Sequence, residues 1–392
     1  MAATPLISRR AILGAAATLA AATPITAALA AGDRPLARVS ARARRVVADA
    51  TVIDMLAPPR LDLANTAWTR PLTDRERADF RSSGITAMHN STGVGGPSAR
   101  TDALIFLAGW QGFVGRNPDI FSLVGTVADL DRAKATGRIG VIMGLQNADQ
   151  FDDVSDVALF HGLGLRCAQL TYNTLNRLGS GCTERVDGGV SDYGVAIIAE
   201  MERRGMLVDV SHSGDRTTLD AIELAKGPIA ITHANARALS HHPRGKTDEA
   251  IRALARKGGV IGISGVRQFV SDREPTTLGN IVDHIDHVAR LVGVEHVGIG
   301  SDADLNGYDD LPPDQYRLLK GGYKASYGFR DKIDIEGFDQ PRKIFNLAEE
   351  MVGRGWTDRD IALVLGGNFR RLLTRAWAPV GLDEPDPPAK KG

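Results

Sequence analysis

Three observations predict an α/β fold closed into a (β/α)8 TIM-type barrel. Apolar stretches rich in β-branched residues alternate with amphipathic stretches through residues 45–375, the pattern of α/β folds. No internal repeat or low-complexity linker interrupts that region, which favours one domain. Two successive apolar stretches end in histidines, His212 and His233. Because the active site of such a barrel lies at the C-terminal ends of its strands, both imidazoles would point to one place.

Eight strands are expected from the apolar stretches. They are residues 52–54, 85–89, 139–145, 167–171, 207–211, 229–232, 260–263 and 296–300. A ninth stretch, residues 121–126, could be an accessory strand. Thr247 and Thr357 have the side chain of a helix N-cap, and the helices they begin should end near Gly258 and Gly366. The long segment 305–340 follows the last strand and could be a lid or substrate loop.

Both ends of the chain are expected to lie outside the barrel. Residues 1–30 contain a twin arginine (Arg9, Arg10), a short Ala-rich apolar run and an Ala-x-Ala site ending at Ala30, which predicts a Tat export signal. The barrel would then span residues 31–378 and a flexible tail residues 379–392. These features predict a periplasmic or secreted protein with no transmembrane segment in its mature form, because the apolar run is too short to span a bilayer.

The composition limits the partners and the covalent framework. Lys+Arg and Asp+Glu both number 47, and no basic stripe is interleaved with aromatic residues, so no nucleic-acid partner is expected. The only cysteines are Cys167 and Cys182. They could form one disulfide in an oxidising compartment, but the position of Cys167 on an expected strand favours a buried thiol. A homodimer is left open.

His212 and His233 are candidate metal ligands, because neutral imidazoles are common ligands of Zn²⁺. The alternative is two unrelated histidines at the starts of loops. The surrounding motifs resemble those of the membrane (renal-type) dipeptidase family of metallopeptidases, within the metal-dependent amidohydrolase kind of barrel. The matching motifs are Asp283-His284-Ile285-Asp286-His287, His296-Val297-Gly298-Ile299-Gly300-Ser301-Asp302, Arg244 with Thr247-Asp248-Glu249, and Gly366-Gly367-Asn368-Phe369.

The resemblance implies a two-zinc site, in which His212 and His233 would be the histidine ligands of one of the two ions. This chain departs from the family at the other ligands. Leu56 and Pro58 stand where the family has a His-x-Asp pair, and Gln146 replaces the bridging glutamate. Neither Leu nor Pro can coordinate a metal, and a neutral amide is a poor bridge between two cations. We therefore expect at most one zinc ion, held by His212, His233 and Gln146, and no two-zinc centre.

The resemblance also assigns substrate-handling roles. Arg244 matches an arginine that grips the substrate carboxylate, although an ion pair with Asp248 or Glu249 is the alternative. Asp302 matches the family's general acid/base, with Asp304 beside it in a turn role.

Three further residues are candidates for the same site. Tyr172 replaces a family histidine and could donate a hydrogen bond to an oxyanion, or simply close the pocket floor. Asn173, which follows it, is a second substrate-binding candidate. His89 ends the second expected strand without a family counterpart, and could be catalytic, a replacement ligand, or bonded to a loop carbonyl.

These residues leave three functions open. The first is a divergent dipeptidase-like hydrolase that uses at most one metal ion on a small peptide-like or amide substrate next to a carboxylate. The second is a metal-independent acid/base enzyme, catalysing isomerisation or elimination on a peptide-derived metabolite. The third is a non-catalytic pseudo-peptidase that binds a carboxylate ligand. A barrel of this kind hosts many reactions, so the fold alone does not choose among them.

Overall fold

The computed structural model of the chain describes residues 39–61, 63 and 66–379. The described residues all belong to one compact unit. The predicted export signal, residues 1–30, and the tail from residue 380 onward lie outside them. Within the described ranges, no helix is long and apolar enough to cross a bilayer.

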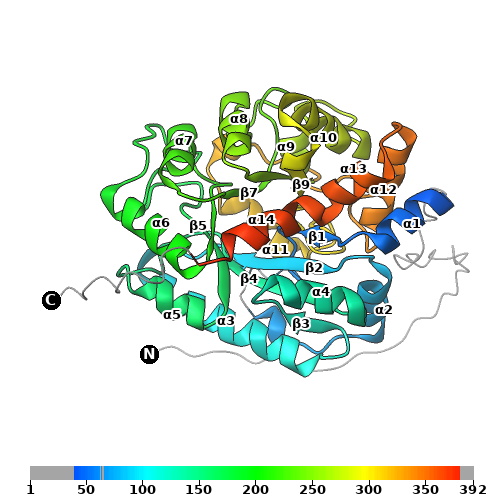
Figure 1. Cartoon of the computed structure of the whole chain (residues 1–392), viewed down its shortest axis with the longest axis horizontal. Helices are drawn as coiled ribbons and strands as arrows, with labels where there is room; N and C mark the ends of the chain where they lie inside the picture. The colour runs from blue at the N-terminus through cyan, green and yellow to red at the C-terminus, as the bar shows by residue number, and fades with distance from the viewer. Residues whose placement is uncertain (1–38, 62, 64–65, 380–392) are drawn as a thin grey trace, which may run out of the picture. The chain divides into compact units, whose positions relative to one another are not determined.

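A closed barrel of parallel strands forms the centre of the fold (Figure 1). The strands in the described ranges are β1 (Ile53–Asp54), β2 (Ala87–Thr92), β3 (Phe121–Leu123), β4 (Ile139–Leu145), β5 (Leu165–Gln169), β6 (Leu207–Asp209), β7 (Ala230–Ala234), β8 (Val260–Ile263) and β9 (Val297–Ile299). They are hydrogen-bonded in the order β2-β1-β9-β8-β7-β6-β5-β4-β3, and a further pairing of β2 with β4 closes the ring. The expected (β/α)8 barrel is confirmed.

The accessory strand expected near residue 121 is β3, and it lies outside the ring. It pairs with the first half of β4, from Ile139 to Val141, whereas β5 pairs with the second half of β4. Strand β2 pairs along its whole length with the other edge of β4, from Gly140 to Leu145. The barrel therefore closes through β2 and β4, and β3 extends the sheet beside β5 without entering the ring.

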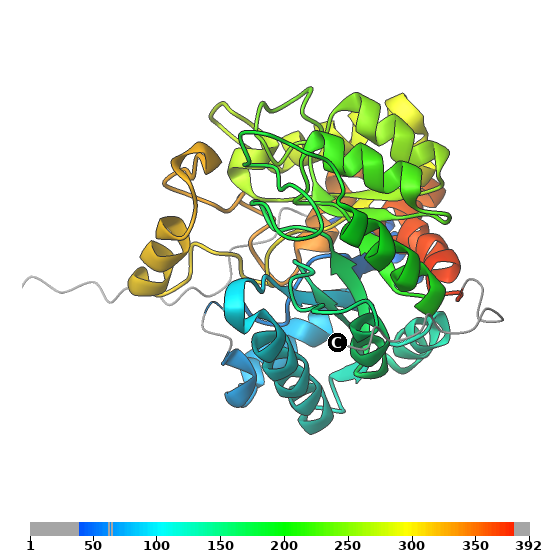
Figure 2. The ribbon, with the colours of Figure 1, turned by 90° about the vertical axis from the view of Figure 1, so that its left-hand side faces the viewer.

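Helices surround the barrel on its outer side (Figures 1 and 2). Those in the described ranges are α1 (Ala41–Asp49), α2 (Asp74–Ser82), α3 (Ala99–Arg116), α4 (Val127–Thr136), α5 (Asp156–Gly162), α6 (Asp192–Arg204), α7 (Asp215–Leu224), α8 (Asp248–Arg256), α9 (Arg267–Val270), α10 (Leu278–Val292), α11 (Pro313–Gly321), α12 (Lys343–Gly353), α13 (Asp358–Ala362) and α14 (Asn368–Ala376). The two predicted N-caps are confirmed, because the Thr247 hydroxyl accepts from Ala250 N and the Thr357 hydroxyl from Asp360 N.

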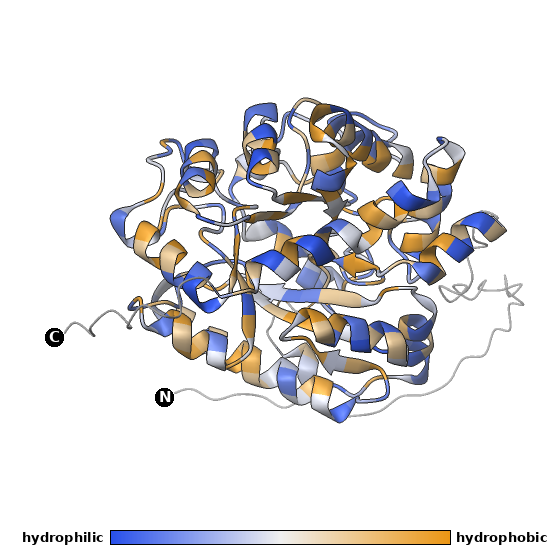
Figure 3. Ribbon diagram, in the orientation of Figure 1, coloured by the Kyte–Doolittle hydropathy of each residue, from blue (hydrophilic) through white to orange (hydrophobic). Residues whose placement is uncertain are grey.

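The core lies between the barrel and this helical shell, where apolar strand residues meet the apolar faces of the helices (Figure 3). The C-terminal helix α14 contributes Phe369, Leu372 and Leu373, which are buried against the strands. Gly366, just before that helix, is required by a close approach, because a Cβ atom there would lie 2.1 Å from the carbonyl oxygen of Thr51. The start of α14 is thereby held against the start of β1.

The segment after β9 forms a lid of its own over the C-terminal face of the barrel. It contains α11 and the short turn η4 (Ala325–Tyr327). Its apolar residues Leu319, Tyr327 and Ile333 form a second, smaller core with Val266 and Phe269 from the region after β8. The long segment predicted as a lid or substrate loop thus covers the face on which the site was expected.

Candidate active site

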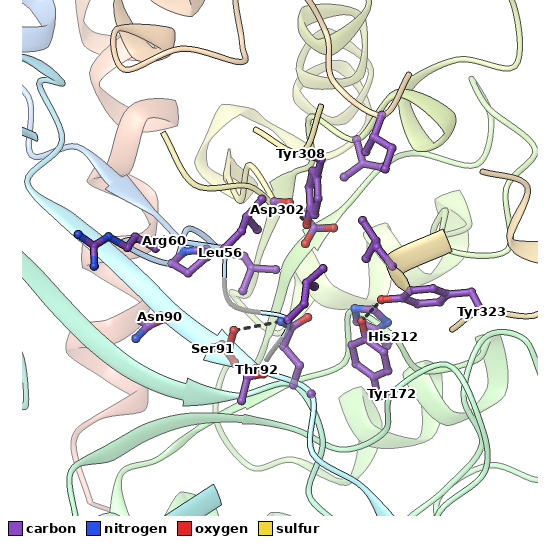
Figure 4. A pocket seen from close by; sticks show the side chains of 18 of the residues that line it. Leu56, Arg60, Asn90, Ser91, Thr92, Tyr172, His212, Asp302, Tyr308 and Tyr323 are labelled. Carbon is purple, nitrogen blue, oxygen red and sulfur yellow. Dashed lines mark hydrogen bonds between the residues drawn. The ribbon is translucent and has the colours of Figure 1, made fainter. Parts of the chain in front are cut away.

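A cavity of about 140 Å³ opens at the C-terminal ends of the strands, under the lid (Figure 4). Residues at or after seven strands reach it: Leu56 (after β1), Ser91 (β2), Gln146 (after β4), Tyr172 (after β5), His212 (after β6), Val266 (after β8) and Asp302 (after β9). The lid contributes four aromatic residues, Tyr308, Tyr323, Tyr327 and Phe329. The cavity therefore lies where the sequence predicted it, and its roof is aromatic.

The imidazoles of His212 and His233 meet at the base of this cavity. Their Nε2 atoms are 3.0 Å apart. The Nδ1 of His212 faces the Oδ1 of Asn173 at 2.7 Å, and the Nδ1 of His233 faces the hydroxyl of Thr232 at 2.9 Å. Only His212 lines the cavity, since His233 is fully buried beneath it. The sequence prediction that the two imidazoles converge is confirmed.

Hydrogen-bond partners assign the same tautomer to both rings. An amide oxygen only accepts, so His212 must donate to Asn173 from Nδ1. The Thr232 hydroxyl donates to Asp209 Oδ2 at 2.5 Å, so it accepts from Nδ1 of His233. In the neutral rings both Nε2 atoms then carry lone pairs, and these face each other. A shared proton or one cation between them would relieve that contact.

Two buried basic side chains, Arg244 and Lys246, are bonded to the backbone next to the two histidines. Burial, followed by the charge of Arg244, lowers the pKa of both His212 and His233 well below 6.5. The Arg244 guanidinium donates to the carbonyl oxygens of Ser211 and His233. Lys246 Nζ, whose pKa burial lowers to about 7, is likewise bonded to protein oxygens, Val210 O and Ser213 O at 2.7 Å and Thr218 Oγ1 at 2.9 Å.

The position of Arg244 differs from both sequence interpretations. It is wholly buried, so the surface ion pair with Asp248 or Glu249 is wrong. It does not line the cavity, and its two terminal nitrogens already hold the ends of the strands that carry the histidines. Lys246, which supports the same strand ends, was missed because nothing in the sequence distinguishes it from a surface lysine.

Asp302 places a carboxylate in the cavity from the end of β9. Its backbone is left-handed, with φ 62°, and its N–H donates to Leu56 O at 2.8 Å. Burial raises the pKa of Asp302 to about 7; Arg244 acts in the opposite direction. Asp304 has the predicted turn role, since its Oδ1 accepts from Asn306 N at 2.9 Å. Asp302 is therefore a carboxyl group in the cavity that can exchange a proton near neutral pH.

A buried ion pair below Asp302 supports its backbone. Lys343 on α12 lies 3.5 Å from Asp54 Oδ2, and both side chains are inaccessible to solvent. Lys343 also donates to the Ser301 hydroxyl at 2.7 Å, and Asp54 Oδ1 accepts from Ser301 N at 2.7 Å. The residue before Asp302 is thus fixed from two sides. Sequence reasoning missed Lys343, which lies 41 positions after Asp302 on a helix.

Tyr172 and Asn173 divide their roles. Tyr172 stacks on His212, with ring centroids 4.1 Å apart, and its hydroxyl bonds to that of Tyr323 at 2.6 Å, as Figure 4 shows. Burial raises the pKa of Tyr172 well above 10, so the hydroxyl keeps its proton. Asn173 does not line the cavity. It orients His212 instead, and its left-handed φ of 59° suits an asparagine.

His89 is not at the barrel mouth, and that prediction is wrong. Strand β2 continues to Thr92, so His89 lies inside the barrel and does not line the cavity. Its Nδ1 bonds to Met55 O at 2.7 Å, the carbonyl bond foreseen as its alternative role. Its ring lies over Gly144, where a Cβ atom would come within 1.8 Å of Nε2. Cys167 and Cys182 are both free thiols in the structure.

The two-metal centre of the resembled family does not fit these residues. Leu56 and Pro58 line the cavity with carbon atoms, and the Gln146 amide donates to Ser91 O at 3.3 Å. Among the described residues, no group of three or more His, Cys, Asp and Glu side chains is placed to hold a metal. The donor set that does converge is the Nε2 pair of His212 and His233.

The fold and the polar groups at its C-terminal face place the chain among the amidohydrolase-like barrels. The model of the membrane dipeptidase family (peptidase family M19) matches residues 41–314. The chain therefore belongs to this family.

Relatives of known sequence and structure agree with that assignment. Dipeptidase aclJ of Aspergillus oryzae is 30% identical over 263 residues, which are 65% of this chain and 56% of that protein. An uncharacterized dipeptidase of Schizosaccharomyces pombe is 34% identical over 177 residues, 43% of this chain and 42% of that protein. The chain thus spans about half the length of these curated relatives.

Two solved structures from Pseudomonas aeruginosa share the fold. An amidohydrolase is 30% identical, with a TM-score of 0.74 over 86% of this chain and 99% of that one. The probable dipeptidase PvdM is 18% identical, with a TM-score of 0.73 over 86% and 98%. At that lower identity the likeness concerns the fold alone.

Proposed function

We propose that this protein is a dipeptidase-family hydrolase that cleaves a peptide or amide bond next to a carboxylate in a small substrate, with at most one metal ion. The observation that carries the proposal is Asp302, a cavity carboxyl with a pKa of about 7, in the same cavity as His212. The export motif in residues 1–30 adds the proposal that the protein acts in the periplasm or outside the cell.

Asp302 supplies the proton transfers of the proposed reaction. With a pKa near the working pH, it can take a proton from the attacking water and return it to the leaving nitrogen. Tyr172 keeps its hydroxyl proton and stands beside His212, so it can donate a hydrogen bond to the oxygen that gains negative charge. The lid residues Tyr308, Tyr323 and Tyr327 line the cavity, and a lid that keeps water from these groups would strengthen both interactions.

The preference for a carboxylate follows from the charges behind the histidines. Arg244 and Lys246 are buried, and the hydrogen bonds of their side chains go to neutral oxygen atoms. Their positive potential favours an anionic substrate group in the cavity. Because Arg244 does not reach the cavity, it acts through this potential and through the strand ends that it holds.

One metal ion would be held by His212 and His233, whose Nε2 lone pairs converge, with Gln146 as the third candidate ligand. Such an ion, zinc being the metal best suited to two imidazoles, would polarise a substrate carbonyl as a Lewis acid. The incomplete ligand set also favours a second candidate: a metal-independent acid/base enzyme, in which Asp302 moves protons in an isomerisation or elimination.

Hydrolysis of a panel of dipeptides and N-acyl amino acids, followed by mass spectrometry, tests the proposal. We expect cleavage by the wild-type protein and loss of cleavage in Asp302→Asn. Elemental analysis of the same preparation should give at most one zinc per chain, absent from His212→Ala. A product of unchanged mass or of lost water, ammonia or another small group, formed by metal-free protein without cleavage, would support the second candidate. Two zinc ions per chain would contradict the inference that Leu56 and Pro58 remove the ligands of one ion.

A further inference from the structure

A buried carboxylate is linked to the imidazole of His233 through a single hydroxyl group. Asp209, the last residue of β6, is inaccessible to solvent. Its Oδ1 accepts from Ser211 N at 3.0 Å, from Ser211 Oγ at 2.6 Å and from Thr232 N at 3.0 Å. Its Oδ2 accepts from the Thr232 hydroxyl at 2.5 Å. All four of these groups donate, so Asp209 acts here only as an acceptor.

Thr232, on β7, joins this carboxylate to His233. A hydroxyl group has one proton to donate, and Thr232 donates it to Asp209. The Nδ1 of His233 lies 2.9 Å from the same hydroxyl oxygen, so it must donate to that oxygen. The carboxylate therefore determines, through the direction of one hydroxyl proton, that Nε2 of His233 keeps its lone pair.

The tautomer of His212 is set by different residues. Its Nδ1 faces Asn173 Oδ1 at 2.7 Å, and the thiol of Cys182 donates to the same oxygen at 3.3 Å. This arrangement involves neither Asp209 nor Thr232. A change at Asp209 should consequently act on the tautomer of His233 and leave that of His212 as it is.

We propose that Asp209 is a positioning residue, which acts through Thr232 to hold His233 in the tautomer whose Nε2 lone pair faces His212. The two Nε2 atoms, 3.0 Å apart, can then take up one cation between them. Histidine ligands commonly donate their other ring N–H to an oxygen atom, which fixes the orientation and tautomer of the ring. Only the use of the pair as a metal site rests on the proposed function, because the tautomer is set by the protein alone.

Replacing Asp209 with asparagine should reverse the tautomer of His233. The backbone N–H groups of Ser211 and Thr232 both donate to Oδ1, so they would hold the amide oxygen at that position. The amide nitrogen would then replace Oδ2 and donate to the Thr232 hydroxyl. That hydroxyl would have its own proton free for Nδ1 of His233. The hydrogen of His233 would move to Nε2 and point at His212, where it would exclude a cation.

Nitrogen-15 NMR of protein labelled at histidine shows which ring nitrogen carries hydrogen, and it needs no turnover. At pH 8 both rings are neutral, since burial lowers their pKa values well below 6.5. In the metal-free wild type we expect hydrogen on Nδ1 of His212 and of His233, with resonances assigned from His212→Gln and His233→Gln. In Asp209→Asn the hydrogen of His233 should lie on Nε2, while His212 keeps its hydrogen on Nδ1.

Titration of the same metal-free proteins with zinc chloride measures the consequence for a cation. Asp209→Asn should bind zinc about 10- to 100-fold more weakly than the wild type, the usual effect of altering a group that orients a ligand. Thr232→Ser keeps the hydroxyl and should keep both the tautomer and the zinc affinity. Thr232→Val has the same shape without the hydroxyl, so it should move the hydrogen of His233 to Nε2 and weaken zinc binding.

Asp54→Asn is the matched control, because Asp54 is an equally inaccessible carboxylate at the end of β1 and belongs to the site of Lys343. It should leave both tautomers unchanged. Hydrogen on Nε2 of His233 in the wild type, hydrogen still on Nδ1 in Asp209→Asn, or the same change in Asp54→Asn would each overturn the proposal.

The remaining variants keep the proposal testable if Asp209→Asn does not fold. The wild-type tautomer and the contrast between Thr232→Ser and Thr232→Val then decide the question. The expected tautomers without zinc binding would support the role of Asp209 and contradict the metal ion of the proposed function. Zinc binding by a wild type with hydrogen on Nε2 of His233 would contradict the role of Asp209 alone.

Discussion

Replacing Lys343 with methionine should destabilise the protein by about 3–5 kcal/mol, the usual effect of breaking a buried ion pair from one side. Lys343 and Asp54 are both fully buried and lie 3.5 Å apart. Asp54 Oδ2 has no hydrogen-bond partner among the described residues, so Lys343 is the charge that compensates it. Methionine keeps the length and apolar character of the side chain, and the loss is therefore the charge and its hydrogen bonds.

The double variant Asp54→Asn/Lys343→Met separates the charge from the packing. It leaves neither charge of this pair in the core, so most of the lost stability should return, and the coupling energy of the cycle should exceed about 2 kcal/mol. Urea unfolding at pH 7, followed by circular dichroism, measures all four proteins. If Lys343→Met costs less than about 1 kcal/mol, or if the two changes are additive, the ion pair does not hold this part of the barrel.

Three further predictions concern the cavity. Burial raises the pKa of Asp302 from 3.8 to about 7, so the protonated carboxyl contributes fully to stability below pH 4 and this contribution is lost as the pH rises through 7. The melting temperature of Asp302→Asn should therefore rise relative to that of the wild type between pH 4 and pH 8. A fall of the variant's melting temperature relative to the wild type over this range would refute the raised pKa. Gln146→Glu should still bind fewer than two zinc ions by elemental analysis, because the ligands missing at Leu56 and Pro58 are not restored. Arg244→Lys should lower kcat as well as raise KM, and lower stability by about 1–3 kcal/mol, since an ammonium cannot reproduce both bonds of the guanidinium; a change in KM alone would show that Arg244 only grips the substrate.

The fold could be predicted from the sequence because buried parallel strands leave a strong local signal. Residues 139–145 and 260–263 were expected as strands and are β4 and β8 to the residue. Strand β2 was expected to end at His89, since polar residues follow. It continues through Thr92 because Asn90, Ser91 and Thr92 pair with Met143, Gly144 and Leu145 of β4. That backbone pairing is set by the neighbouring strand and is invisible in local composition.

Sequence reasoning could place only those site residues that lie close to the C-terminal end of a strand. His212 and Asp302 follow strands directly, so their meeting at one cavity follows from the barrel. The direction of Arg244 could not be predicted, because its loop turns it back under the strands that carry the histidines. Lys343 lies on a helix 41 positions after Asp302, where nothing in the local sequence distinguishes a buried lysine from an exposed one.

Two positions at which the sequence departs from the resembled family's metal-ligand motifs follow the strands that flank β2 in the ring. The groups able to react, His212 and Asp302, follow β6 and β9, while Leu56 and Gln146, which replace metal ligands, follow β1 and β4. At Leu56 and Pro58 the cavity presents carbon atoms, which suit an apolar part of a ligand and cannot hold a cation. A barrel that had only lost its activity would have no reason to keep a cavity carboxyl with a pKa near 7 beside an oriented imidazole pair. We therefore propose that the changes at Leu56 and Gln146 alter what the cavity binds, while His212 and Asp302 keep the groups that can react.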